Sequence, residues 1–466
     1  MNDNTLSRVT QQLRELAESQ APGSRLPSVR DLMSRHRTGP STVQRAVAQL
    51  VAEGLVQTRP GCGNFVAQRT RSIAPADLGW QSTVLGGRTI STDGLDELLE
   101  VPQAGVMPLT VGYLPEDLQP LRQLAAAAAR AARRPGVWGR TPSEGTEGLR
   151  TWLAHDVGTG LRAQDVLVTS GGQAALSTAF RTLAAPGSPV LVESPTYIGA
   201  LAAARAAGLR PVPVPTDRQG VRPDLLEETF SSSGARLFYC QPTYANPHGA
   251  TLATERREAV LRTVRSAGAF LIEDDPARDL FLEKEPPPSP LVSQDHEGHV
   301  VYVRSLTKFV VPGLRVGALC ARGAAGARLK AARIVDDFFV AGILQETAVE
   351  FLTSPAWRRH MSTVRKILRV RRDALVEVVR RDLPQASLSL VPSGGLHLWL
   401  KLPDEVDDVL LAEELRREGV LVSAGRHWFS AEPPGSFLRI SYAGAEIDVL
   451  SEGVAVLGRM LDNMTA

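Results

Sequence analysis

From about residue 145 onward, short apolar segments alternate with stretches whose apolar residues recur at helical spacing. The apolar segments are VLVT, PVLVE, LFYC, FLIEDD and VVYVRS, and the helical stretches between them include 173–184, 196–207, 254–267 and 324–335. This alternation predicts an α/β unit with a mostly parallel sheet and helices on both of its faces. Binding and catalytic residues of such sheets gather at the carboxyl ends of the strands, so those positions are the ones to inspect.

The most specific of these positions follows the strand HVVYVR, which ends just before Ser305. Lys308 lies three residues after Ser305, and Arg315 lies seven residues after Lys308. The amine can form a Schiff base with an aldehyde, while the hydroxyl and the guanidinium can hold that ligand's phosphate. Only five lysines occur in the chain, so an ordinary surface lysine explains this combination less well.

Two other predicted strand ends carry weaker signals. Gly172 and Gln173 follow the strand DVLVT and open a helix, whose free N–H groups can bind a phosphate. A plain tight turn explains the same residues. Asp274 ends the strand AFLIEDD, where its carboxylate can pair with a protonated ring nitrogen or simply cap a helix.

The first 70 residues follow a different pattern. Apolar residues recur at helical spacing over 6–16, a capping box at 28–31 opens a second helix, and a third helix runs from about 40 to 54. Residues 55–66 are predicted as strand, glycine-rich turn and strand. Residues 1–68 are therefore predicted as an α+β winged helix-turn-helix that binds double-stranded DNA through its third helix and its wing. The predicted DNA-binding side chains are Arg30, Ser41, Thr42, Gln44, Arg45 and Arg59.

The charge distribution agrees with this interpretation. Residues 1–72 contain ten arginines, no lysine and five acids, a net charge of +5, whereas the whole chain carries only +2. A basic head on a slightly acidic body is typical of a nucleic-acid-binding module joined to another domain. A solvated arginine-rich surface is the alternative.

The head also resembles the GntR family of bacterial regulators. The resemblance rests on GSRLPSVRDLM and on TVQRAVAQLVAEGLVQTRPGCGNFV. The family usually has an arginine at the start of the recognition helix, where this chain has Pro40. DNA binding is still expected, but without direct base recognition by that arginine.

The remaining chain is predicted to consist of a linker and a body. Residues 69–106 lack clear periodicity and predict a linker with one short helix. The body covers 107–466, with a large subdomain at about 145–345 and a smaller α/β subdomain at about 355–466.

The body resembles the fold-type I aminotransferases, which use pyridoxal 5'-phosphate (PLP), from about Met107 to the C-terminus. The resemblance rests on the order and spacing of VESPTYIGA, PTYANPHG, FLIEDDP, SLTK and FLRISYA. It implies roles for nine residues. Lys308 would bind the cofactor covalently, Asp274 would pair with its ring nitrogen, and Asn246 would donate to its phenolic oxygen. Tyr197 would stack on its ring, and Arg439 would bind a substrate or effector carboxylate. The residues that would hold its phosphate are Gly172, Gln173, Ser305 and Arg315.

Two positions depart from the family's pattern. Ala277 stands where these enzymes usually have a tyrosine that assists the asparagine at the phenolic oxygen. Arg140 stands where a tyrosine is common, and it could still meet a phosphate. The missing hydroxyl predicts weaker cofactor binding and little transamination, unless Tyr239 or Tyr244 supplies it.

A GntR-like head on an aminotransferase-like body resembles the MocR subfamily of bacterial transcription regulators. The resemblance implies a homodimeric regulator that binds operator DNA and senses PLP, or an amino acid or amine that reacts with it. A working aminotransferase with an accessory DNA-binding head is one alternative. A repressor whose body only dimerises, without cofactor, is the other.

Cysteines and the N-terminus limit the remaining possibilities. Cys62, Cys240 and Cys320 are far apart and form no cluster with histidines, so neither a metal site nor a disulfide framework is predicted. The N-terminus has no apolar signal segment, and no uninterrupted apolar stretch approaches eighteen residues. The protein is therefore expected in the cytoplasm, without a membrane partner.

Overall fold

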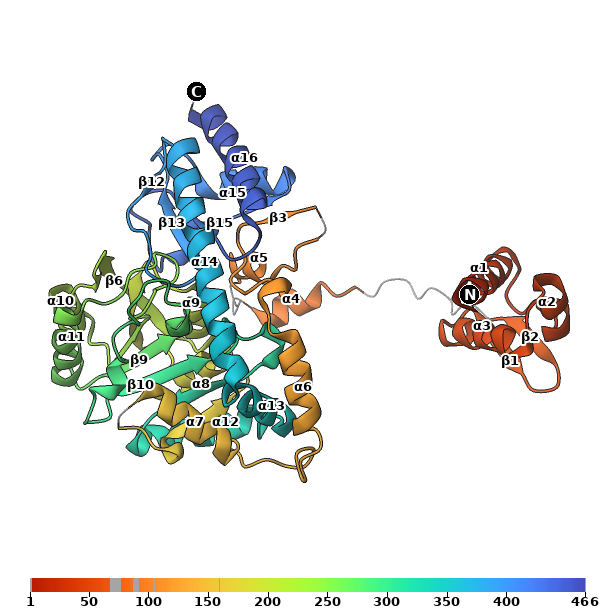
Figure 1. Cartoon of the computed structure of the whole chain (residues 1–466), viewed down its shortest axis with the longest axis horizontal. Coiled ribbons are helices and arrows are strands. Elements are labelled where there is room, and N and C mark those ends of the chain that lie inside the picture. Colours follow the sequence, from red (N-terminus) through yellow and green to blue (C-terminus); the bar gives the residue numbers. More distant parts are fainter. Residues whose placement is uncertain (1, 68–76, 87–91, 104, 159, 466) are drawn as a thin grey trace. The chain divides into compact units, whose positions relative to one another are not determined.

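The computed structural model of the chain describes residues 2–67, 77–86, 92–103, 105–158 and 160–465. The chain divides into two compact units, Met1–Thr89 and Ile90–Ala466 (Figure 1). The first unit contains the predicted DNA-binding head, and the second unit is the body. No helix of the described residues is both long and apolar enough to cross a membrane.

The head is a winged helix-turn-helix, as predicted. Its core is formed by side chains from all three helices and both strands, including Leu13, Leu32, Val43, Leu50 and Val66. The two strands of the wing pair in antiparallel register, from Val56 opposite Val66 to Arg59 opposite Gly63. The elements are α1 (Asn2–Ser19), α2 (Val29–His36), α3 (Pro40–Ala52), β1 (Val56–Arg59) and β2 (Gly63–Val66).

Local sequence signals explain where the helices of the head begin. The Ser28 hydroxyl accepts a hydrogen bond from the Asp31 backbone N–H at 3.2 Å, and the Asp31 carboxylate accepts one from the Ser28 N–H at 3.0 Å. This reciprocal capping box satisfies two N–H groups that a helix start leaves free. Pro40 opens α3, at a position where its missing N–H costs no helical hydrogen bond.

The body is built on one eight-stranded sheet with the strand order β4-β11-β10-β9-β8-β5-β6-β7. Neighbouring strands are parallel except for β11 and β7, which run antiparallel to their neighbours. The mostly parallel sheet is therefore confirmed, as a mixed sheet. Its strands are β4 (Val166–Thr169), β5 (Pro189–Ser194), β6 (Arg210–Asp217), β7 (Gly220–Val221), β8 (Leu237–Cys240), β9 (Phe270–Asp275), β10 (Val300–Ser305) and β11 (Gly317–Cys320).

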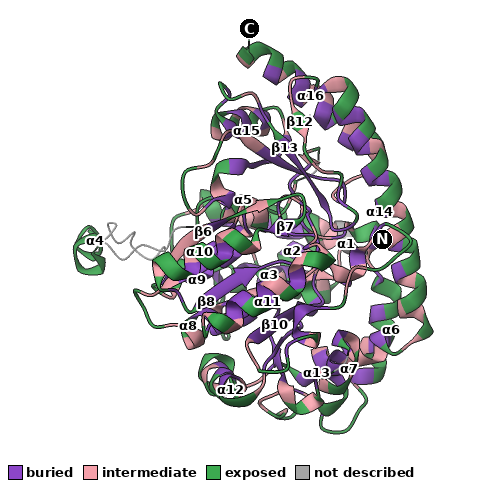
Figure 2. Cartoon of the chain, turned by 90° about the vertical axis from the view of Figure 1, so that its left-hand side faces the viewer, coloured by how far each residue is buried: buried purple, intermediate pink, exposed green. Residues whose placement is uncertain are grey.

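Helices cover both faces of this sheet. Successive residues of β8 alternate between two hydrophobic clusters: Leu237 and Tyr239 belong to one, Phe238 and Cys240 to the other. Figure 2 shows the strands buried between helices whose outer faces are exposed. The helices of this part are α6 (Leu121–Ala131), α7 (Glu147–Val157), α8 (Gly172–Leu183), α9 (Ile198–Ala206), α10 (Pro223–Ser233), α11 (Thr254–Ser266), α12 (Gly323–Asp337) and α13 (Gly342–Leu352).

Strand β6 was not predicted because proline normally interrupts a strand. Pro211, Pro213 and Pro215 occupy alternate positions in it, opposite Val190, Val192 and Ser194 of β5. Alternate residues of a strand direct their N–H groups to the same side, so these prolines remove donors from one side only. On that side β6 pairs only with the two-residue strand β7.

The smaller subdomain contains a four-stranded sheet with the order β12-β13-β16-β15. Residues outside the predicted range 355–466 also belong to this subdomain, because β3 (Met107–Pro108) pairs in parallel with β14 (Val420–Leu421). The other elements are β12 (Ser387–Leu388), β13 (His397–Lys401), β15 (Ser423–Ala424), β16 (Phe437–Ser441), α14 (Pro355–Asp382), α15 (Asp408–Arg417) and α16 (Ile447–Thr465).

The predicted linker over 69–106 is too long at its C-terminal end. Its described part contains two short helices, α4 (Trp80–Leu85) and α5 (Leu95–Leu99), rather than one. Leu95 and Leu98 of α5 pack against the body's cluster of Trp399, Trp428 and Phe429, and Glu100 forms an ion pair with Arg416. Residues 92–103 therefore belong to the body. The rest of the predicted linker includes residues 69–76, 87–91 and 104, which lie outside the described residues.

Candidate functional site

A cavity of about 340 Å³ lies at the carboxyl ends of the central strands of the large sheet. Eight of the nine predicted site residues line it, and Arg439 is the ninth, which reaches it through Asn246. Sequence reasoning did not assign the cavity's other lining residues. The eight are Gly172, Gln173, Tyr197, Asn246, Asp274, Ser305, Lys308 and Arg315, and the unassigned ones are Leu95, Leu99, Tyr113, Leu176, Gln241, Pro276 and Thr307.

Lys308 follows β10 and enters this cavity with its amine above an aromatic ring. Its Nζ lies 4.1 Å from the centroid of the Tyr113 ring. Burial lowers the pKa of Lys308 to about 7, assisted by the nearby positive charge of Arg439 and opposed by Asp274. A substantial share of the amine is therefore neutral near pH 7, and the neutral form is the nucleophile.

Asp274, at the end of β9, has one oxygen already bonded and one still available. Its Oδ2 accepts hydrogen bonds from the Tyr239 hydroxyl and from the Gln241 side-chain amide, each at 2.8 Å. Within the described part of the chain, no donor reaches Oδ1. Burial raises the pKa of Asp274 to about 6, and the two hydrogen bonds oppose that rise. The carboxylate is thus oriented by two side chains and can bind one more proton donor.

The start of α8 forms a narrow space beside Ser305 and Arg315. A Cβ on Gly172 would lie 3.3 Å from the Ser305 Cβ, and one on Gly171 would lie 2.9 Å from an Arg315 nitrogen. Arg315 is fixed by a hydrogen bond of 2.9 Å to the Ser170 carbonyl. Backbone N–H groups, a hydroxyl and a guanidinium therefore lie close together at the start of α8, which is a set of donors suited to a phosphate.

Gln173 lines the cavity, and its side chain also contacts α9. Its side-chain amide donates to the Gly199 carbonyl at 2.8 Å and accepts from the Tyr197 hydroxyl at 3.3 Å. The side chain therefore positions Tyr197, while the backbone N–H at the start of α8 stays the predicted phosphate contact. Sequence reasoning missed this because it depends on where α9 lies relative to α8.

Arg439 is a buried cation without a carboxylate partner among the described residues. It is 1% exposed and donates to the Asn246 side chain at 3.2 Å and to the Thr110 carbonyl at 2.6 Å. Its guanidinium lies 4.5 Å from the Trp428 ring centroid, and its Nε has no partner in that part of the chain. Burial lowers the pKa of Arg439 to about 9. A ligand carboxylate would compensate this buried charge.

The departures from the family's pattern have structural counterparts. Ala277 is buried in the main core and does not line the cavity. The Tyr239 hydroxyl is used by Asp274, and the Tyr244 ring packs against Gly394. Neither tyrosine has a recorded hydrogen bond to Asn246. Arg140 is exposed and also lies outside the cavity lining.

The predicted DNA-binding residues lie on the outer surface of the head. Five of the six are exposed, and Thr42, on the first turn of α3, is half-buried. Arg59 lies on the wing with its guanidinium 4.8 Å from the Phe65 ring centroid. No ion pair is recorded for Arg30, Arg45 or Arg59 among the described residues, so their charges are available to phosphates.

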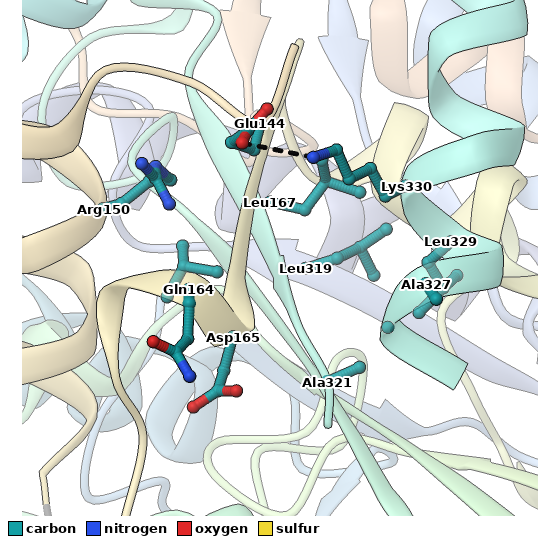
Figure 3. Close-up of a pocket in the computed structure, with 12 residues that line it drawn as sticks. Glu144, Arg150, Gln164, Asp165, Leu167, Leu319, Ala321, Ala327, Leu329 and Lys330 are labelled. Atoms are coloured by element: carbon teal, nitrogen blue, oxygen red, sulfur yellow. Dashed lines mark ion pairs between the residues drawn. The ribbon is translucent and has the colours of Figure 1, made fainter. Parts of the chain in front are cut away.

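A separate cavity of about 260 Å³ lies at the other end of β4 (Figure 3). Its charged groups are already paired: Lys330 lies 3.2 Å from Glu144, and Arg150 donates to the Gly145 and Ala163 carbonyls. None of the predicted site residues lines it.

Comparison with known proteins identifies relatives of both units. The profile of aminotransferase class I and II matches residues 104–457, and the profile of bacterial regulatory proteins of the gntR family matches residues 5–66. The uncharacterized HTH-type transcriptional regulator YdfD of Bacillus subtilis is 27% identical over 95% of this chain and 93% of its own length.

Enzymes are also among the relatives. The 2-aminoadipate transaminase of Thermus thermophilus is 31% identical over 82% of this chain and 96% of its own length. The crystal structure of LysN, the α-aminoadipate aminotransferase of the same species, in complex with N-(5'-phosphopyridoxyl)-L-leucine, superposes with a TM-score of 0.77 at 30% identity. That match covers 83% of this chain and 99% of the enzyme.

Proposed function

We propose that this chain is a transcriptional regulator that binds PLP at Lys308. The chain belongs to the aminotransferase class I and II family, and residues 5–66 form a gntR-family DNA-binding domain. The same two-part organisation is named as an HTH-type transcriptional regulator in Bacillus subtilis and Escherichia coli. The observation that carries the proposal is the juxtaposition, in one cavity, of Lys308, Asp274 and the cluster of donors at the start of α8.

The residues of the cavity suit this cofactor in three ways. Asp274 has a free oxygen for a ring nitrogen, and it would hold a proton there. Ser305, Arg315 and the N–H groups of Gly172 and Gln173 would bind the phosphate, while Tyr197 would lie against the ring and Asn246 beside its phenolic oxygen. When bound, PLP supplies an aldehyde and an electron-withdrawing ring. Lys308, partly neutral near pH 7, would hold its nucleophilic amine ready for that aldehyde.

The effector is proposed to be PLP itself or an amino compound that carries a carboxylate. Arg439 supports the carboxylate, because its buried charge lacks an anionic partner in the described chain and lies beside Asn246. Effector binding regulates DNA binding only if the effector has different affinities for two arrangements of the protein.

The function is tested by measuring operator binding by the full chain, by fluorescence anisotropy, with and without PLP. The visible absorption spectrum of the same samples reports cofactor occupancy. Saturable, salt-sensitive DNA binding that changes with PLP occupancy supports the proposal. DNA binding that is absent, or that is indifferent to PLP and to every amino compound tried, contradicts it.

The working form is proposed to be a homodimer. Large apolar side chains remain exposed on the body, namely Trp138, Val335 and Phe338, at 73%, 84% and 72%. A second copy covering such residues would remove them from water and match two operator half-sites. Light scattering of the full chain tests this, and a monomeric mass at micromolar concentration contradicts it.

A working aminotransferase is the second candidate. The relation to 2-aminoadipate transaminase and the complete set of Lys308, Asp274, Asn246 and Arg439 favour it. Turnover of an amino acid with 2-oxoglutarate separates the two functions. We infer at most weak turnover, because Ala277 replaces the hydroxyl that the enzymes place at the phenolic oxygen.

The substitution Ala277→Tyr should tighten PLP binding by roughly ten- to a hundred-fold, the worth of one charge-assisted hydrogen bond. Ala277 itself lies in the core, but it directly follows Pro276, which lines the cavity, so the longer tyrosine side chain is the one expected to reach it. Titration of apo-protein with PLP, followed by absorbance, measures the change. Ala277→Phe is the matched control, because it adds the same ring without the hydroxyl. Equal affinity of the wild type and the tyrosine variant, or brisk turnover by the wild type, would show that Ala277 does not weaken the site.

The substitution Gln241→Leu should weaken PLP binding by roughly tenfold or more and move its pH dependence upward. Loss of one donor to Asp274 raises the pKa of that carboxyl above its value of about 6, so the carboxyl protonates at higher pH and binding declines earlier on acidification. PLP titrations between pH 5 and 8 test this. Gln385→Leu, which disrupts only a contact to Asp462, is the control. An unchanged pH profile would exclude this positioning role.

A further inference from the structure

A second groove of the body, with a volume of about 560 Å³, lies between the two subdomains and outside the Lys308 cavity. One wall comes from the β5–β6 edge of the large sheet and the other from the small sheet, whose strands β12 and β13 lie above β6 in Figure 1. Its size is that of a site for a small organic ligand. None of the nine predicted site residues lines it.

The small-sheet wall of this groove is aromatic. The Trp399 and Phe437 rings stack with centroids 5.1 Å apart and an interplanar angle of 9°, and Phe429 lies 5.6 Å from Phe437. The opposite wall is formed by Pro195, Pro213 and Pro215, which offer ring carbons but no N–H donors. Walls of this composition are chemically suited to a flat apolar group.

His248, one of the residues that line the groove, has an unused donor. The Nδ1 atom of His248 accepts a hydrogen bond from the Ala250 N–H at 3.2 Å. Burial lowers the pKa of His248 to about 4, so the ring is neutral and its proton sits on Nε2. That Nε2–H is buried and has no acceptor among the described residues. A buried donor without an acceptor is costly, and an anionic oxygen of a ligand would satisfy it.

The groove also contains an unpaired cation. Arg218 is exposed at the rim, and no hydrogen bond or ion pair is recorded for it among the described residues. Its neighbour Asp217 is occupied, because both carboxylate oxygens accept from Arg256 at 2.8 Å. The cavity of Figure 3 differs in this respect, since its lysine and its arginine already have partners.

From these features we propose that the groove is a second ligand site, specific for a small aromatic carboxylate. The ring would lie between Trp399 and the prolines, and the carboxylate would accept hydrogen bonds from His248 and Arg218. The exposed carboxylate of Glu432 at the same rim suits an additional ammonium group, as in an aromatic amino acid. The site is independent of the proposed PLP function.

Binding there would reach the Lys308 cavity through two short routes. Pro195 lines the groove and Tyr197, two residues later, lines the cavity. Trp399 of the groove stands opposite Arg439 in the β13–β16 pair. A ligand held by both walls also favours one arrangement of the two subdomains, and it thereby influences PLP affinity.

The test is calorimetric titration of the full-length protein with three probes. L-phenylalanine and 3-phenylpropionate carry the carboxylate and should bind saturably, whereas phenethylamine lacks it and should not bind. The Lys308→Ala variant should bind both carboxylates as the wild type does, because no reaction with PLP is involved. In the presence of saturating PLP, the titration should still show one binding site for phenylalanine per chain, the one in the groove.

Variants locate the site. Arg218→Ala should weaken binding of both carboxylates roughly tenfold. Ser389→Trp, which fills the groove from an exposed position, should abolish binding at an unchanged melting temperature. Arg262→Ala, an exposed arginine of α11 outside the groove, should have no effect. The proposal is overturned if the wild type shows no saturable binding, or if folded Ser389→Trp binds phenylalanine like the wild type.

Discussion

Lys308→Ala should abolish the covalent attachment of PLP to the protein completely. Lys308 is the only lysine among the lining residues of the cavity, which it shares with Asp274 and with the donors at the start of α8. No other side chain there offers an amine. The measurement is borohydride reduction after incubation with PLP, followed by intact-mass analysis. The wild type should gain one reduced cofactor per chain, and the variant none.

The matched control is Lys330→Ala. Lys330 also belongs to the body, but its Nζ lies 3.2 Å from Glu144 at the other end of β4, and its side chain is 46% exposed. This variant should label like the wild type. A reduced adduct that persists in Lys308→Ala, or that is lost in Lys330→Ala, would assign the reaction to another lysine.

The residues of this site differ in how far the sequence predicts their positions. Ser305, Lys308 and Asp274 end predicted strands, and parallel strands bring their carboxyl ends to one edge, so their meeting follows from the strand pattern. Asn246 and Arg439 lie in loops or strands whose positions were available only through the resemblance to aminotransferases. Both are found beside the cavity, bonded to each other at 3.2 Å.

Other contacts depend on register, which sequence patterns do not specify. Tyr239 and Gln241 reach Asp274 because β8 and β9 pair with Tyr239 opposite Ile272 and Cys240 opposite Glu273. A shift by one residue would direct the Tyr239 side chain to the other face of the sheet. Leu95 and Leu99 line the cavity from a segment whose short periodicity gives no indication of where it packs.

The second large effect concerns DNA. Arg45→Ala and Arg59→Ala should each weaken operator binding by the full chain roughly tenfold at low salt, and each should reduce the slope of log affinity against log salt by about 0.9. Arg45 is exposed on α3 and Arg59 is exposed on the wing, and neither forms an ion pair with any residue that the structure describes. Their charges are therefore free to replace counterions on two different phosphates.

Arg14→Ala is the control for this prediction. Arg14 also belongs to the head, but its guanidinium is bonded to both oxygens of Glu53 at 2.6 and 2.8 Å. An exposed pair of this kind contributes little to stability, so the variant should fold and bind DNA with an unchanged slope. If the body alone, residues 90–466, binds operator DNA as well as the full chain, the head is not the DNA-binding unit.

Pro40 makes the salt dependence especially informative. At the first position of α3 it starts the helix without a side chain that can donate to a base edge, where the GntR pattern has an arginine. Phosphate contacts then supply a larger share of the affinity, and these contacts weaken with salt while base contacts largely do not. The ratio of operator to non-operator affinity should therefore change less between the wild type and the two arginine variants than the affinities themselves. Loss of discrimination in Arg45→Ala, with the salt slope unchanged, would instead place that guanidinium on a base.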